Sequence, residues 1–176
     1  MTEAEWLACE DPQRMMKRLG VKPLDRKLLL WRGACCRRAW GLLPPAARAY
    51  VEVSERLADG LAGEAEVSAG PGAGGCGEAE AFLGEDFAAQ ARLVRCVFGN
   101  PFRSVTVDSA WLAWEGGTAR TLAQAINGER AFDRLPVLAD ALEDAGCADA
   151  GLLGHLRGPG PHSRGCWAVD LLLGKE

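Results

Sequence analysis

The last quarter of the sequence, residues 135–174, constrains the fold more than any other part of the chain. A leucine-rich segment with apolar residues at helical spacing comes first, and both histidines of the protein follow it. Apolar residues that recur every three or four positions predict an amphipathic helix. The turn Gly158-Pro159-Gly160-Pro161 prevents any helix from continuing through it. We therefore expect short helices on both sides of a loop with a defined shape.

Four residues in this quarter form a candidate metal site: Cys147, His155, His162 and Cys166. Two thiolates and two imidazoles satisfy the tetrahedral coordination that zinc prefers. His162 and Cys166 are four residues apart, so one helical turn would present both side chains to the same point. The spacing lacks the Cys-x2-Cys pair of common zinc modules. The same residues are therefore also consistent with buried cysteines and locally hydrogen-bonded histidines that hold no metal.

Helix signals recur along the rest of the chain, whereas strand-forming residues are scarce. Thr2 with Glu5 forms a capping box, and Asp11-Pro12 begins a helix that should stop at Gly20. Asp25 precedes a longer apolar pattern that reaches about Leu42. Val105–Val107 is a short extended candidate, too short to argue for a sheet. The sequence predicts an all-α fold, a compact bundle of about six to eight helices.

A glycine-rich segment, residues 68–77, interrupts the helical pattern. Its composition is typical of a flexible loop. It lacks the preceding strand and the following Gly-Lys-Ser/Thr that a phosphate-binding loop requires. A helix from Glu78 to Phe98 should follow. The length of 176 residues favours a single helical domain over residues 1–176 that contains this loop.

The composition of the chain indicates the cellular compartment in which we expect the protein. Hydrophobic residues make up 48% of the chain, which is ample for a packed core. No apolar run approaches the ~20 residues that a membrane-spanning helix needs, and the N-terminus lacks the features of a signal peptide. Seven cysteines, an odd number, favour reduced thiols. We expect a cytoplasmic protein with no membrane partner.

Basic residues are concentrated between Lys17 and Arg38, where eight of them lie with one acidic residue, Asp25. Arg26 and Arg37 are eleven residues apart, close to three helical turns, so they should share one side of a helix. Five basic residues could follow the phosphates of a nucleic acid: Lys17, Lys22, Arg26, Arg37 and Arg38. The interpretation we favour is a solvated charged face, or one that pairs with the acidic C-terminal helices.

No sequence motif predicts catalysis. The chain contains neither Gly-x-Ser-x-Gly nor His-Glu-x-x-His. The carboxylates of Asp140, Glu143 and Asp144 lie opposite the leucines of their helix, as expected for a solvated face. We predict a non-enzymatic intracellular interaction or regulatory module with a protein partner and with zinc as its candidate cofactor. The alternatives are a nucleic-acid-binding protein and a metal-dependent hydrolase that uses the four-residue site.

Several segments spread over nearly the whole chain carry a resemblance to known proteins: Met1–Leu7, Ala34–Arg38 with Trp40, Phe98–Arg103, Arg130–Cys147, Arg157–His162 and Arg164–Lys175. They resemble a large paralogous family of bacterial proteins without an assigned activity, best represented in planctomycetes. The resemblance breaks at about residues 64–85, where those proteins carry a long Ala/Arg-rich helical insert. It implies a single compact unit and no catalytic residue. Leu138–Gly146 also resembles the core of a short domain found beside repeats in such bacteria.

Overall fold

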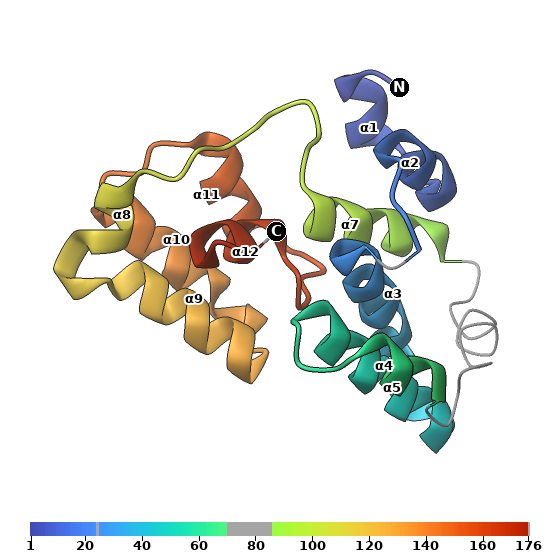
Figure 1. Cartoon of the computed structure of the whole chain (residues 1–176). Coiled ribbons are helices and arrows are strands. Elements are labelled where there is room, and N and C mark those ends of the chain that lie inside the picture. Colours follow the sequence, from blue (N-terminus) through green and yellow to red (C-terminus); the bar gives the residue numbers. More distant parts are fainter. Residues whose placement is uncertain (24, 70–85, 176) are drawn as a thin grey trace. The chain divides into compact units, whose positions relative to one another are not determined.

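The computed structural model describes residues 1–23, 25–69 and 86–175 (Figure 1). Within these residues every regular element is a helix, so the predicted all-α class is confirmed. The described residues form eleven α-helices, more than the six to eight that we predicted. One reason is that the helix expected to reach Leu42 is divided into two shorter elements. None of the described helices combines the length and apolar character needed to cross a bilayer.

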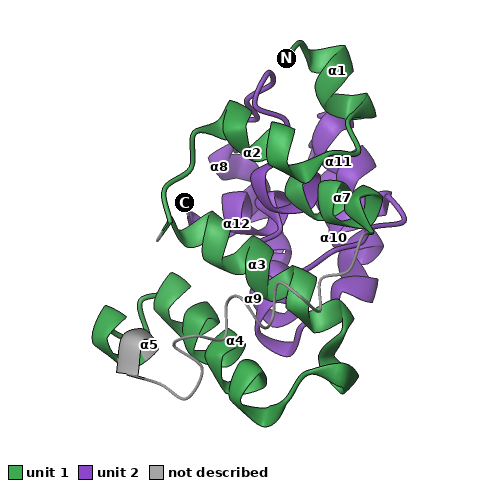
Figure 2. Ribbon diagram, turned by 90° about the vertical axis from the view of Figure 1, so that its right-hand side faces the viewer, with its two compact units in different colours: residues 1–94 green, residues 95–176 purple. Residues whose placement is uncertain are grey.

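The chain divides into two compact units, which we call the N-terminal unit (residues 1–94) and the C-terminal unit (residues 95–176) (Figure 2). The single domain over residues 1–176 stays a prediction, because two units can be the halves of one domain. Most of the predicted glycine-rich loop, from residue 70 onward, lies outside the described residues. The start of the helix expected from Glu78 lies outside them too.

Helix caps explain where the first helices of the N-terminal unit begin. The side chain of Thr2 accepts a hydrogen bond from the Glu5 N–H, and Glu5 accepts one from the Thr2 N–H, which confirms the capping box. Asp11 accepts from two N–H groups at the start of the next helix. The elements are α1 (Glu3–Ala8), α2 (Pro12–Leu19), α3 (Arg26–Arg38), η1 (Trp40–Leu42), α4 (Pro45–Ala58), α5 (Glu64–Ala69) and the first turns of α7 (Phe87–Phe98).

The helix expected to run to Leu42 is shorter in the structure. α3 ends at Arg38, and a separate 3-10 turn, η1, covers Trp40–Leu42. Asp25 stands before α3 but makes no side-chain capping bond to it; its carboxylate instead accepts from the Lys22 N–H. Small buried clusters line the inner side of α3, including one formed by Leu29, Leu30 and Ala58. α3 therefore packs along α4.

The C-terminal unit contains one large apolar core. Ile126 of α9, Leu142 of α10 and Leu172 of α12 all lie in it with at most 1% of their surface exposed. Such burial of large aliphatic side chains provides the main stabilisation of a helical unit. The elements are α8 (Ser109–Ala113), η2 (Trp114–Gly116), α9 (Thr118–Glu129), η3 (Phe132–Arg134), α10 (Leu135–Asp144), α11 (Ala150–Arg157) and α12 (Trp167–Leu173).

Local sequence explains the first connection of this unit and the starts of two of its helices. Val105–Val107 forms no strand and lies in the connection from α7 to α8. Asp133 does not cap α10, because it lies inside η3 and α10 begins two residues later, with a proline in its first turn. Asp149, by contrast, caps α11 and accepts from the Leu152 N–H at 2.8 Å.

Candidate metal centre

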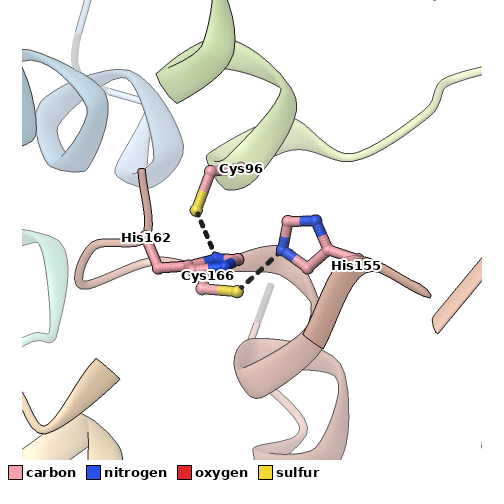
Figure 3. Close-up of side chains that lie close together, drawn as sticks. All are labelled: Cys96, His155, His162 and Cys166. Atoms are coloured by element: carbon pink, nitrogen blue, oxygen red, sulfur yellow. Dashed lines mark hydrogen bonds between the residues drawn. The ribbon is translucent and has the colours of Figure 1, made fainter. Parts of the chain in front are cut away.

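Four side chains of the C-terminal unit converge on one point: Cys96, His155, His162 and Cys166 (Figure 3). Their candidate ligand atoms all lie within 4.8 Å of one another. Cys96 belongs to the last turn of α7, and His155 belongs to α11. His162 lies in the loop that joins α11 to α12, and Cys166 stands at the N-cap of α12. Three separate segments of the chain therefore contribute to the cluster.

Local sequence explains how α11 and the following loop present their histidines. Asp149 fixes the start of α11, and the buried Leu152 lies one turn before His155, so the imidazole faces partly inward. The loop then turns at Gly160, whose φ is 78°. A β-carbon at Gly160 would lie 2.9 Å from the backbone nitrogen of His162, so only glycine fits there. These constraints place His162 beside His155.

The spacing of the ligand atoms fits a tetrahedral ion. His155 Nε2 lies 3.2 Å from Cys166 Sγ, and His162 Nδ1 lies 3.8 Å from Cys96 Sγ. Zn–S bonds of about 2.3 Å and Zn–N bonds of about 2.0 Å place a sulfur and a nitrogen ligand about 3.5 Å apart. The two observed separations lie on either side of that value. The cluster can therefore hold a metal ion such as zinc.

Contacts behind the ligands orient the two imidazoles. His162 Nε2 lies 3.2 Å from the carbonyl oxygen of Gly158. When Nε2–H donates to this carbonyl, the Nδ1 lone pair of the neutral ring is left facing Cys96. The His155 ring packs against Trp167, with ring centroids 5.2 Å apart, and meets the His162 ring edge-on at 5.0 Å. A hydrogen bond from the second ring nitrogen to a backbone carbonyl, as at His162, is typical of histidines that bind a metal.

The pKa values of the two thiols are shifted in opposite directions. Hydrogen bonding from Cys96, joined by that from His155 and His162, holds the pKa of the Cys166 thiol well below its usual range, although burial opposes this. The same bond to Cys166, together with burial, raises the pKa of Cys96. Burial lowers the pKa of His162, but its interactions with Cys166 and the Gly158 carbonyl outweigh this and raise it. The hydrogen bond between the two sulfurs thus favours the ionised form of Cys166 over that of Cys96.

The structure brings together three of the four predicted ligands and places Cys96 where we expected Cys147. Cys147 follows the left-handed turn at Gly146, and its N–H donates to the carbonyl of Leu142 at 2.9 Å. Its side chain is buried in the apolar core and is not part of the cluster. Sequence reasoning missed Cys96 because it lies 59 residues before His155, in an apolar helix where a cysteine resembles any other core residue.

Most of the predicted nucleic-acid-binding residues have acidic partners in the N-terminal unit. Arg26 pairs with Asp59 at 3.1 Å, Arg37 with Glu55 at 2.6 Å, and Arg38 with Asp86 at 2.6 Å. The partners are thus not the acidic C-terminal helices that we named as one possibility. The other two predicted residues, Lys17 and Lys22, are exposed. Nucleic-acid binding stays a prediction.

The carboxylates of α10 are surface groups, as expected. Asp140 and Glu143 accept from Arg157 of α11 at 2.7 Å and 2.6 Å, and more than half of each carboxylate side chain is exposed. The hydrogen bonds to Glu143 and Asp140 raise the pKa of Arg157. This arrangement joins α10 to α11 at the surface and contributes little to stability.

Comparison with known proteins adds no family assignment. No protein-family model matches the sequence, and comparisons with curated proteins and with solved structures gave no significant match. The resemblance to the planctomycete-type family stays a prediction, because none of these comparisons bears on it.

Proposed function

We propose that this protein is a non-enzymatic interaction or regulatory module whose C-terminal unit is held by a structural zinc ion. The ligands would be Cys96, His155, His162 and Cys166. One observation carries the proposal: four ligand atoms of the types zinc prefers lie within 4.8 Å of one another, although Cys96 and Cys166 are 70 residues apart in the sequence. A protein partner is part of the same proposal.

The number of ligands supports a structural rather than a catalytic role. Four protein ligands complete the tetrahedral coordination of zinc, whereas catalytic zinc sites use three and keep one position for water or substrate. Cys166 is fully buried and 2% of Cys96 is exposed, so the two sulfur ligands are shielded from solvent. These observations favour the structural site over the metal-dependent hydrolase that we considered from the sequence.

A zinc ion at this site would stabilise the loop between α11 and α12. Residues 158–166 join α11 to α12 without a helix, so few backbone hydrogen bonds hold this loop. Structural zinc contributes roughly 10–16 kcal/mol of binding free energy, which appears as folding free energy. An ion at this site would tie the loop to the last turn of α7 and to α11.

Zinc content is the direct test. The full chain should be purified without chelators and measured by elemental mass spectrometry, together with Cys96→Ser, Cys166→Ser and Cys147→Ser. We expect about one zinc per chain in the wild type and in Cys147→Ser, and a loss of most of it in the other two, because a hydroxyl replaces a thiolate ligand. Cys147→Ser is the matched control, since it also alters a buried cysteine of this unit.

Two results would count against this proposal. Loss of zinc from Cys147→Ser with retention by Cys96→Ser would restore the ligand set predicted from the sequence. The second result concerns a wild-type chain that is purified without zinc. Such a chain would be titrated with Co²⁺, whose thiolate complexes absorb strongly. No absorption band on that titration would exclude a thiolate metal site altogether.

The nucleic-acid alternative has its own test. Binding of the full chain to duplex DNA can be measured by fluorescence anisotropy at two salt concentrations. If the basic face binds phosphates, neutralising Arg37 and Arg38 should weaken binding and flatten its salt dependence. Unchanged binding in that double variant would remove this alternative.

A further inference from the structure

We propose that the zinc site is also a redox-sensitive switch, in which a hydroperoxide joins Cys96 to Cys166 as a disulfide and the zinc leaves. This inference rests on the proposed function. Its starting observation is that the two sulfur atoms lie within 4.8 Å of each other and that both cysteines are free thiols. Two thiolates on one zinc ion are already close enough that a small movement brings them into bonding range.

Three other buried cysteines within the described residues are arranged differently. Cys35 and Cys36 are neighbours in α3, where the helical backbone points their side chains in different directions. Cys147 is buried but is not part of the cluster. Cys96 and Cys166, by contrast, hold their sulfur atoms within 4.8 Å of each other, which favours a disulfide between them.

The backbone beside Cys166 allows the remaining movement. A disulfide needs an S–S distance of about 2.05 Å and Cα atoms about 4.4–6.8 Å apart. Cys96 is held in a helix, but Cys166 stands at the end of the non-helical loop. Gly165, directly before it, has a φ of 85° and no side chain to restrict rotation. We therefore expect Cys166 to move toward Cys96 rather than the reverse.

The chemistry balances with hydrogen peroxide as the oxidant. One zinc-bound thiolate attacks a peroxide oxygen, forming a sulfenic acid and releasing hydroxide. The second thiolate attacks the sulfenic sulfur, forming the S–S bond and releasing a second hydroxide. Two electrons from the sulfurs thus reduce the O–O bond, and two protons from solvent convert both hydroxides to water. Zinc loses two of its four ligands, and two imidazoles alone hold it poorly.

The oxidised protein would be a defined second state. The disulfide keeps the last turn of α7 joined to the start of α12, because it replaces the zinc link between Cys96 and Cys166. His155 and His162 lose their shared ligand, so the loop between them is released. A dithiol reductant and zinc should restore the first state, because thiol–disulfide exchange is reversible.

The test uses the zinc-loaded full chain and hydrogen peroxide. Released zinc is followed with a colorimetric chelator, and disulfides are located by peptide mapping after free thiols are blocked. We expect about one zinc per chain to be released in step with one Cys96–Cys166 disulfide, and to rebind after dithiothreitol is added and removed. The Cys147→Ser variant should behave in the same way.

The possible results separate the two proposals. A chain that keeps its zinc while other cysteines oxidise would overturn the switch and leave the structural zinc site standing. Zinc release with sulfinic acid at Cys166 and no disulfide would also overturn the switch. A chain that binds no zinc at the outset would overturn both.

Discussion

At Gly99, directly after α7, the backbone turns with a φ of 71°. A β-carbon at this position would lie 3.1 Å from Cγ of Trp167, closer than an ordinary contact. Trp167 in turn packs against the His155 ring. One glycine therefore satisfies both the end of a helix and the close approach of the tryptophan behind a metal ligand.

Replacing Gly99 should therefore lower the stability of the fold. We expect Gly99→Ala to lower the free energy of unfolding by about 1–3 kcal/mol, from left-handed strain and displacement of Trp167. Gly128→Ala is the control, because Gly128 lies in α9 with open space around it. That change should leave stability unchanged or raise it by up to about 1 kcal/mol. Urea denaturation measures both, and equal effects would contradict the steric argument.

Cys35 illustrates how burial controls thiol reactivity. Burial, with a smaller effect of Cys36, raises the pKa of Cys35 to about 12. Because the pKa is raised, the thiolate is scarce below it, at about one molecule in 10⁴ at pH 8. We expect iodoacetamide to leave Cys35 unmodified in the folded chain at pH 8 and to alkylate it in guanidinium chloride. Fragment mass spectrometry distinguishes it from Cys36, and rapid labelling of the folded chain would show that Cys35 is not buried.

The packing of α3 on α4 confirms one prediction about the basic residues of α3 and contradicts another. The eleven-residue spacing correctly places Arg26 and Arg37 on one side of α3, since both pair with acidic residues at the end of α4 or just beyond it. That side is not the solvated face that we favoured. The Glu55 side chain is only 3% exposed, and it accepts two hydrogen bonds from Arg37.

Replacing Arg37 should therefore lower the free energy of unfolding far more than replacing its neighbour Arg38. Arg37→Ala leaves a buried carboxylate without its main partner and should cost about 3 kcal/mol of unfolding free energy. Arg38→Ala removes the same charge, but Asp86 is half exposed, so its cost should be at most about 1 kcal/mol. Denaturant unfolding of both variants provides the comparison. A cost for Arg38→Ala as large as that for Arg37→Ala would show that burial does not set the strength of these pairs.

For the whole molecule, all four candidate ligands lie within the C-terminal unit. A structural zinc contributes roughly 10 kcal/mol or more, which is comparable to the roughly 5–15 kcal/mol net stability of a typical domain. Metal removal should therefore affect this unit far more than the other.

Hydrogen exchange can test this difference within one sample. After treatment with a chelator we expect faster exchange in α11, α12 and the last turn of α7, and little change in α3 and α4. The zinc-loaded chain is the reference, and zinc added back should restore protection. Equal acceleration in α3 and α4 would show that the effect of the metal is not confined to the C-terminal unit.

The helical class, several helix caps and three of the four candidate ligands could be predicted from the amino-acid sequence. Caps, glycine stops and apolar spacing act over about one or two helical turns, so the helix starts at Thr2 and Asp11 could be predicted from neighbouring residues alone. The folded structure was needed to show that Cys96 rather than Cys147 joins the cluster, and that Arg37 faces α4. Both outcomes depend on which distant helix packs nearby, and no local pattern in the chain carries that information.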